Sequence, residues 1–253
     1  MSEQTVEIFG AEPGKKGALL NRFHDPKTGQ YFALSYPEGD PFFAGVAKVH
    51  AMGFTGKGTT CAMLDTGMML QHPMIKRNLQ ESIDLTGEGA EDLNGHGTST
   101  TMKLLLTAPD TTLVNIKVVG ADGRGEEKNL VRGIEVAVEK GVTAINMSLG
   151  VYHKKWGIWD CNGDCPVCLA AKKAAIAGVM ITAAAGNEPG KTSCPAKLGM
   201  TTDYVISVAA FDFEKRIVPA YSGRGNLVAP SDGQFPLNEV DANGQIIAMT
   251  GKE

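Results

Sequence analysis

Three polar residues in this sequence have side chains that together suit acyl-transfer chemistry: Asp65, His96 and Asn187. In that chemistry a histidine takes the proton of a serine nucleophile, an aspartate orients the imidazole, and an amide N–H stabilises the oxyanion that forms. The order Asp, His, Ser along a chain is one of the known arrangements of this machinery. Taken singly, each residue also fits an ordinary turn. The hypothesis therefore depends on the elements that would bring the three together.

The surrounding sequence alternates between apolar runs of strand length and helix-like segments. Apolar runs predict strands at 59–64, 112–119, 142–149, 179–184 and 204–210, and other patterns predict helices at 44–51, 129–140 and 170–177. Unbroken apolar strands that alternate with helices indicate a parallel sheet buried on both faces. Asp65 and Asn187 each follow such a strand, at the edge where ligands of parallel sheets bind. His96 is expected in a glycine-flanked loop, because glycines let a backbone enter a crowded site.

Five ordered motifs give these residues a context. They are Leu64-Asp65-Thr66-Gly67, Asn94-Gly95-His96-Gly97-Thr98, Ile145-Asn146-Met147-Ser148-Leu149-Gly150, Ala184-Ala185-Gly186-Asn187 and Tyr221-Ser222-Gly223-Arg224-Gly225. Over residues 43–251 the chain resembles the subtilisin-like (S8) family of serine peptidases. The resemblance implies an α/β fold, a three-layer α/β/α sandwich with a mostly parallel sheet. It also implies endoproteolysis through an acyl-enzyme.

The resemblance also implies a role for each site residue. Asp65 would be the acid of the catalytic triad, His96 the general base and Asn187 the oxyanion donor. The segment Ser148-Leu149-Gly150 would offer backbone hydrogen bonds to an extended polypeptide, which is a form of strand addition. The expected partner is therefore a polypeptide substrate or a peptide ligand.

The family's nucleophilic serine lies in a Gly-Thr-Ser-x-Ala-x-Pro motif, which this chain approaches without reaching the serine. Residues 246–251 match the approach, and Lys252 and Glu253 then stand at the Thr and Ser positions. A carboxylate cannot replace the serine alkoxide. We therefore expect residues 1–253 to be a fragment, truncated before the serine and inactive alone. The alternatives are a catalytically dead peptide-binding or regulatory module, and a split enzyme completed by a C-terminal segment on a second chain.

Four of the five cysteines fall in the region after the third motif: Cys161, Cys165, Cys168 and Cys194. They could form a tetrahedral zinc site, for which the spacing of Cys165 and Cys168 is suitable. They could instead form two disulfides that brace the pocket loop, as the resemblance to some members of the family suggests, or stay reduced on a surface loop. The sequence leaves these three readings open. Cys61 lies in a predicted strand and is expected to be a small apolar core residue.

The sequence gives only weak indications, or none, of other ions and partners. The acidic, glycine-rich segment 120–127 lacks the spacing of an EF-hand and is expected to be a solvated turn. The chemistry above requires no cofactor, and a structural calcium or zinc ion stays open. The chain is 43% hydrophobic with a net charge of −4, and it has neither a basic stripe for nucleic acid nor a polybasic run for a membrane surface.

The N- and C-terminal residues suggest how the chain divides into segments and in which cellular compartment it is expected. Residues 1–40 are expected to form an N-terminal extension or short pro-segment, and residues 41–253 a peptidase domain that is incomplete at its C-terminus. The first residues lack the charged and apolar regions of a signal peptide, which favours the cytoplasm. Paired cysteines would instead favour export.

Overall fold

The fold is described from a computed structural model of the chain. It covers residues 18–24, 31–36, 41–155, 158–159, 161–212, 215–225, 227–230, 237–240 and 246–249, and it describes side chains within 45–153, 161–212 and 215–225. Lys252 and Glu253, which stand at the Thr and Ser positions of the serine motif, lie outside the described residues. Among the described residues, no helix is both long enough and apolar enough to cross a membrane.

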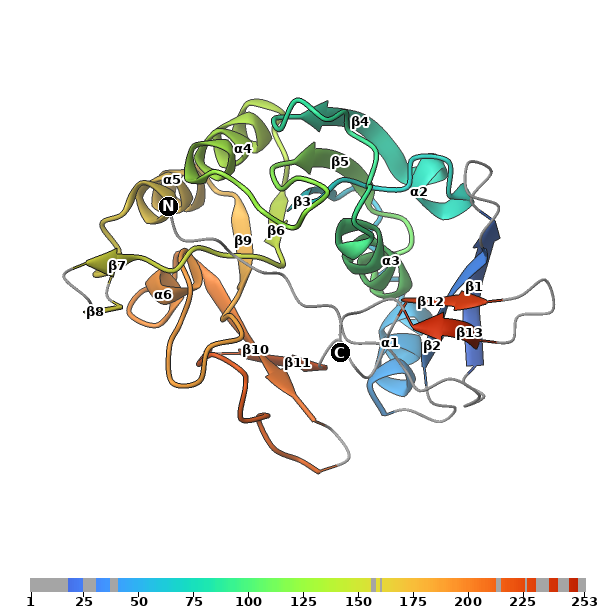
Figure 1. Cartoon of the computed structure of the whole chain (residues 1–253). Helices are drawn as coiled ribbons and strands as arrows, with labels where there is room; N and C mark the ends of the chain where they lie inside the picture. Colours follow the sequence, from blue (N-terminus) through green and yellow to red (C-terminus); the bar gives the residue numbers. More distant parts are fainter. Residues whose placement is uncertain are drawn as a thin grey trace.

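A parallel sheet of seven strands forms the centre of the molecule (Figure 1). Its order is β11-β10-β9-β6-β3-β5-β4, and every pair of neighbours in it is parallel. The strands are β3 (Thr60–Asp65), β4 (Leu79–Asp84), β5 (Thr112–Lys117), β6 (Ala144–Met147), β9 (Met180–Ala184), β10 (Ile206–Phe211) and β11 (Leu227–Pro230). The sheet confirms the fold class expected from the alternation of apolar runs and helices.

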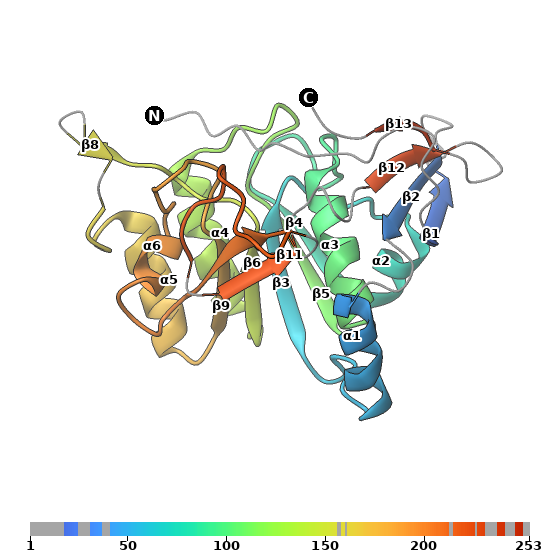
Figure 2. The same ribbon diagram turned by 90° about the horizontal axis from the view of Figure 1, so that it is seen from below.

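Helices cover both faces of this sheet, as Figure 2 shows. They are α1 (Pro41–Ala51), α2 (Pro73–Asn78), α3 (His96–Thr107), α4 (Glu127–Glu139), α5 (Pro166–Ile176) and α6 (Ala196–Gly199). Alternate residues of β3 face opposite cores, because successive side chains of a strand point to opposite faces. Ala62 and Leu64 belong to a core shared with α4, α5 and α6, whereas Cys61 and Met63 belong to one shared with α2 and α3. The result is the three-layer α/β/α sandwich.

Cys61 behaves as the core residue that the sequence predicts. Its side chain is 7% exposed and lies in the cluster formed with α2 and α3. Burial raises the pKa of its thiol to about 12, so the thiol stays protonated at neutral pH. Cys61 is therefore separate in place and in chemistry from the other four cysteines.

A second sheet has four antiparallel strands in the order β1-β2-β12-β13. These are β1 (Ala18–His24), β2 (Tyr31–Tyr36), β12 (Leu237–Val240) and β13 (Ile246–Met249). Strands near the two ends of the chain thus lie side by side, on the side of the molecule that carries α2 and α3 (Figures 1 and 2). The division of the chain at residue 40 stays a prediction. A two-stranded ribbon, β7 (Lys154–Lys155) and β8 (Ile158–Trp159), completes the elements described here.

The helix α2 begins with a buried histidine, and this predicts a pH-dependent stability. His72 is 3% exposed, and its Nδ1 accepts the backbone N–H of Met74 at 3.3 Å. Burial lowers the pKa of His72 from 6.5 to about 4, so the folded protein holds a neutral ring. The unfolded chain takes up a proton first as the pH falls below 6.5. Stability is therefore lost between pH 6.5 and 4, by at most about 3 kcal/mol from this group.

Urea unfolding at pH 7 and at pH 4.5 measures this loss. We expect His72→Asn, which keeps a side-chain cap for the helix, to lose less stability than the wild type over the same interval. An equal loss in both proteins would show that His72 does not cause it.

Candidate active site

The carboxyl ends of three neighbouring strands bring together the residues that the sequence singles out. The strands β9, β6 and β3 are adjacent in the sheet and parallel. Asp65 is the last residue of β3, Ser148 directly follows β6, and Asn187 comes three residues after β9. Because the carboxyl ends of parallel strands meet at the same edge, these residues border one region of the molecule.

A hydrogen bond joins the predicted acid and base. His96 Nδ1 lies 2.7 Å from Asp65 Oδ1, and both residues are buried, at 3% and 1% exposure. The Asp65 carboxylate also accepts the backbone N–H of Thr66 at 2.7 Å, and Thr100 Oγ1 lies 3.2 Å from its Oδ2. These contacts hold the carboxylate in place and orient the ring. Nε2 is then the ring nitrogen that can exchange a proton with a reacting group.

A second aspartate, which the sequence reasoning missed, organises the loop before His96. Oδ1 of Asp92 accepts the backbone N–H groups of Asn94 and Gly95 at 3.0 and 2.8 Å. Its Oδ2 accepts both the backbone N–H and the hydroxyl of Thr98, at 2.8 and 2.6 Å. Asp92 thus satisfies amides that the first turn of a helix leaves without partners. Its position just before the glycine-flanked histidine was the only signal in the sequence.

The Asp92 carboxylate also connects this loop to the strand end at Asp65. The hydroxyl of Thr66 donates to Asp92 Oδ1 at 2.9 Å, and the same hydroxyl oxygen accepts the backbone N–H of Gly97 at 2.9 Å. Thr66 follows Asp65 and Gly97 follows His96, so these contacts link the two segments independently of the Asp65–His96 hydrogen bond. This second link fixes the separation of the Asp65 and His96 side chains.

The expectation of a loop around His96 is wrong, because His96 is the first residue of α3. Residues 96–102 are all buried, so tertiary packing stabilises a helix that begins with residues of low helix propensity. The two glycines that flank His96 are needed for different structural reasons. Gly95 has φ of 100°, a left-handed conformation that other residues adopt at a cost. Gly97 lies so close to the Gly67 carbonyl oxygen that a Cβ would collide with it.

This close approach makes Gly97→Ala a sharp test of the site's packing. An added Cβ would also lie 3.1 Å from Asp65 Oδ1, so α3 must move away from the strand end that carries Asp65. We expect a loss of about 2 kcal/mol or more in the free energy of unfolding, measured by urea denaturation. The control is Gly45→Ala in α1, where no atom lies within 4 Å of the added Cβ. That change should be neutral or stabilising by up to about 1 kcal/mol, and equal effects of the two substitutions would contradict the packing argument.

The remaining predicted residues lie in two segments that contact each other. Asn187 is exposed, in the turn that follows β9 and contains Gly186 with φ of 99°. Val151 exchanges two backbone hydrogen bonds with Cys194, at 2.9 and 2.8 Å. Gly150 packs directly against the side chain of Ser193. The segment after β6 and the segment after Asn187 therefore support each other. The roles of Asn187, Ser148, Leu149 and Gly150 stay predictions.

Comparison with known proteins decides the family. Residues 56–245 match the model of the subtilase family, peptidase S8. The chain belongs to the subtilase family. It is 33% identical over 195 residues to subtilisin DY of Bacillus licheniformis, which covers 72% of this chain and 67% of that protein.

Two further relatives extend this likeness. The subtilase-type proteinase RRT12 of Saccharomyces cerevisiae is 28% identical over 245 residues, which is 88% of this chain and 47% of that protein. An intracellular serine protease of Paenibacillus polymyxa is 32% identical over 197 residues, or 70% of this chain and 57% of that protein. The chain spans about half to two thirds of the length of these subtilases.

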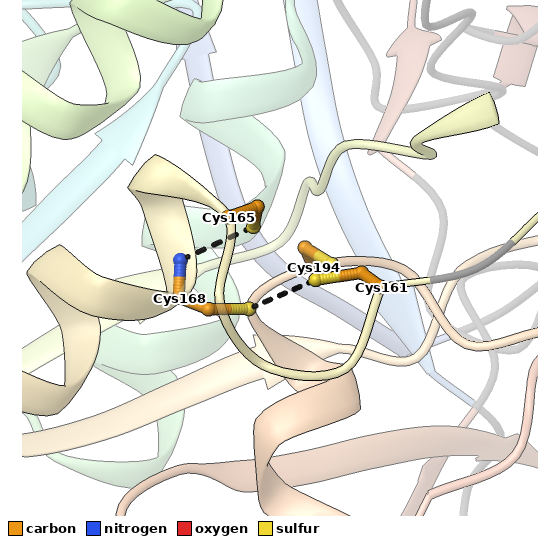
Figure 3. Close-up of side chains that lie close together, drawn as sticks. All are labelled: Cys161, Cys165, Cys168 and Cys194. Atoms are coloured by element: carbon orange, nitrogen blue, oxygen red, sulfur yellow. Dashed lines mark hydrogen bonds between the residues drawn. The ribbon is translucent and has the colours of Figure 1, made fainter. Parts of the chain in front are cut away.

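This subtilase carries a second group of reactive side chains. Cys161, Cys165, Cys168 and Cys194 gather at the N-terminus of α5, with their Sγ atoms all within 4.8 Å of one another (Figure 3). All five cysteines have free thiols in this structure. Hydrogen bonds with the Cys168 and Cys194 side chains lower the pKa of Cys165 far below its usual range. Cys161, Cys165 and Cys168 are close together in the sequence, whereas Cys194 is brought close to them by the tertiary fold.

Proposed function

We propose that the protein containing these residues is a serine endopeptidase that hydrolyses peptide bonds in extended polypeptides. The observation that carries the proposal is the buried 2.7 Å hydrogen bond between Asp65 and His96 at the carboxyl edge of the sheet. Membership of the subtilase family supports a protease and polypeptide substrates. The nucleophile of this proposal is a serine held near His96.

In this proposal His96 and Asp65 act on a serine held near Nε2. The serine oxygen attacks the scissile carbonyl while Nε2 takes its proton, and the carbonyl oxygen becomes an oxyanion. The Asp65 carboxylate stabilises the imidazolium that forms. His96 then gives the proton to the leaving amine, which departs and leaves an ester between the serine and the acyl group. Water attacks this ester by the same steps and releases the free serine.

Two segments of the chain would hold the substrate and its transition state. In this proposal the exposed side chain of Asn187 donates an amide N–H to the oxyanion, which is an interaction worth about 10²-fold or more in rate. The backbone after β6, at Ser148-Leu149-Gly150, would pair with the substrate as an added strand. Such pairing reads the peptide backbone, so it suits endopeptidase cleavage within unfolded chains.

The test is hydrolysis of an unfolded protein by the polypeptide as it is encoded, including any residues that follow Glu253. Internal cleavages are expected, with new N-termini identified by mass spectrometry. The His96→Ala variant, purified in the same way, should give none. A folded full-length polypeptide that cleaves no unfolded substrate would overturn the proposal in favour of a peptide-binding module.

A further inference from the structure

The four-cysteine cluster has the dimensions of a metal site. The Sγ atoms of Cys161 and Cys168 are 4.0 Å apart, and no two of the four Sγ atoms are more than 4.8 Å apart. In a tetrahedral site with Zn–S bonds of about 2.3 Å, neighbouring sulfurs are about 3.8 Å apart. Small movements of the side chains would therefore bring all four sulfurs to bonding distance of one central ion.

The backbone around the cluster is arranged to support thiolates. The N–H of Gly163 lies 3.3 Å from Cys161 Sγ, and the N–H of Cys168 lies 3.4 Å from Cys165 Sγ. Cys165 is also the N-cap of the eleven-residue helix α5, where the helix dipole favours negative charge. Four thiolates around a divalent ion carry a net charge of −2, and these donors lie where that charge develops. Hydrogen bonds to ligating groups are a regular feature of metal sites.

The cluster is closed rather than open. Cys168 is fully buried and Cys194 is 2% exposed, while Cys161 and Cys165 are partly buried. A zinc ion with four protein sulfurs has no open position for water or substrate, which is the pattern of structural sites.

We propose that Cys161, Cys165, Cys168 and Cys194 bind one structural zinc ion that ties the segment after β6 and the segment after β9 to α5. Cys194 is paired with Val151, close to the segment at 148–150, and Cys161 to Cys168 lead into the helix. The ion would cross-link residues about thirty positions apart in the chain. This inference does not depend on the proposed peptidase activity.

The geometry favours a metal over two disulfides. A disulfide has an S–S distance of about 2.05 Å and joins each sulfur to one partner. Here each sulfur lies near three others, and the Sγ atoms of Cys161 and Cys168, 4.0 Å apart, are at about twice the bond length. A shared centre accounts for all four positions, whereas pairwise bonding does not.

A neighbouring set of side chains provides a competing site. His153 Nε2 and Glu127 Oε1 are 3.5 Å apart, and both group with Cys165 within 4.8 Å. This set offers three ligands and shares Cys165 with the cluster. Zinc prefers four ligands in structural sites, so we place the ion among the four sulfurs. His153→Ala is then the variant that separates the two sites.

The experiment measures zinc content and free thiols in the full-length polypeptide expressed under reducing conditions. We expect one zinc per chain by elemental analysis. After denaturation with a chelator and no reductant, all five thiols of residues 1–253 should react with iodoacetamide, as located by peptide mass mapping. Cys168→Ser should lower the zinc content to below about one tenth per chain and reduce the melting temperature by about 10 °C.

Two matched controls make the result specific. Cys61→Ala, which lies in the other core, and His153→Ala should each retain one zinc per chain. If Cys168→Ser does not fold, the wild-type zinc content and thiol count still decide the question. The proposal is overturned by a wild-type protein without zinc, by a reactive thiol at Cys61 but at none of the four clustered cysteines, which indicates two disulfides, or by loss of zinc in His153→Ala. None of these readouts uses peptidase activity, so they stand whether or not the proposed function holds.

Discussion

Replacing His96 with alanine is expected to lower kcat for peptide hydrolysis by about 10⁶-fold, a magnitude taken from the corresponding change in subtilisin itself. The reason is that, in the proposed mechanism, the His96 ring oriented by its hydrogen bond to Asp65 accepts and returns the serine proton. The measurement is the rate of hydrolysis of a chromogenic peptide by the full-length polypeptide and its variant, at equal concentrations of folded protein.

Asp65→Asn provides a graded comparison for the same site. Asparagine keeps the shape of the side chain but favours the wrong tautomer of the imidazole, so kcat should fall by about 10⁴-fold, less than for His96→Ala. Thermal unfolding of each variant controls for loss of structure. Retention of more than a tenth of the wild-type rate by a folded His96→Ala variant would remove His96 from the mechanism.

Lys117 is expected to have the largest effect of any described charged residue on stability. It ends β5 directly beside Asp65 of β3, and its side chain is completely buried. Its Nζ donates to the carbonyl oxygen of Glu91 at 3.2 Å and lies 3.3 Å from Glu88 Oε2. Lys117→Ala would leave a cavity and a partly buried carbonyl without its donor. We expect a loss of about 3 kcal/mol or more in the free energy of unfolding, measured in urea.

Two comparisons separate the causes of this loss. Lys117→Met keeps most of the buried volume but removes the donor, so it should cost about 1–2 kcal/mol. Glu88 is 42% exposed, so we attribute little of the effect to the ion pair itself. Lys128→Met, at a lysine that is 74% exposed, should change stability by less than about 0.5 kcal/mol. A loss as small as this in Lys117→Ala would show that the buried amine is not structural.

The strands of the sheet could be predicted where they are buried on both faces. The run before Asp65 reads as continuous apolar sequence because residues 61–65 of β3 are all buried. In contrast, β4 was missed because its sequence, Leu-Gln-Glu-Ser-Ile-Asp, is that of an edge strand with partly exposed side chains. The start of α3 was missed for another reason. Its glycine, serine and threonines are poor helix formers, and packing against the rest of the protein decides their conformation.

In the candidate site, too, some residues could be predicted from the sequence and others could not. Asp65 and His96 could be identified because their motifs combine a strand end, a glycine-flanked histidine and a fixed order. Asp92 could not, since its role depends on which amides of the folded loop point toward it. The cysteine cluster could be narrowed to three readings but not resolved, because the distance from Cys194 to the other thiols is set by the tertiary fold.

The central claim is that Asp65 and His96 activate a serine, and labelling with diisopropyl fluorophosphate tests it most directly. Only an activated serine oxygen displaces fluoride from this reagent at an appreciable rate, forming a stable phosphate ester. We predict one adduct per full-length polypeptide, located on a serine by peptide mapping, and its absence in His96→Ala. An unlabelled wild-type protein, or equal labelling of the wild type and His96→Ala, would contradict the claim.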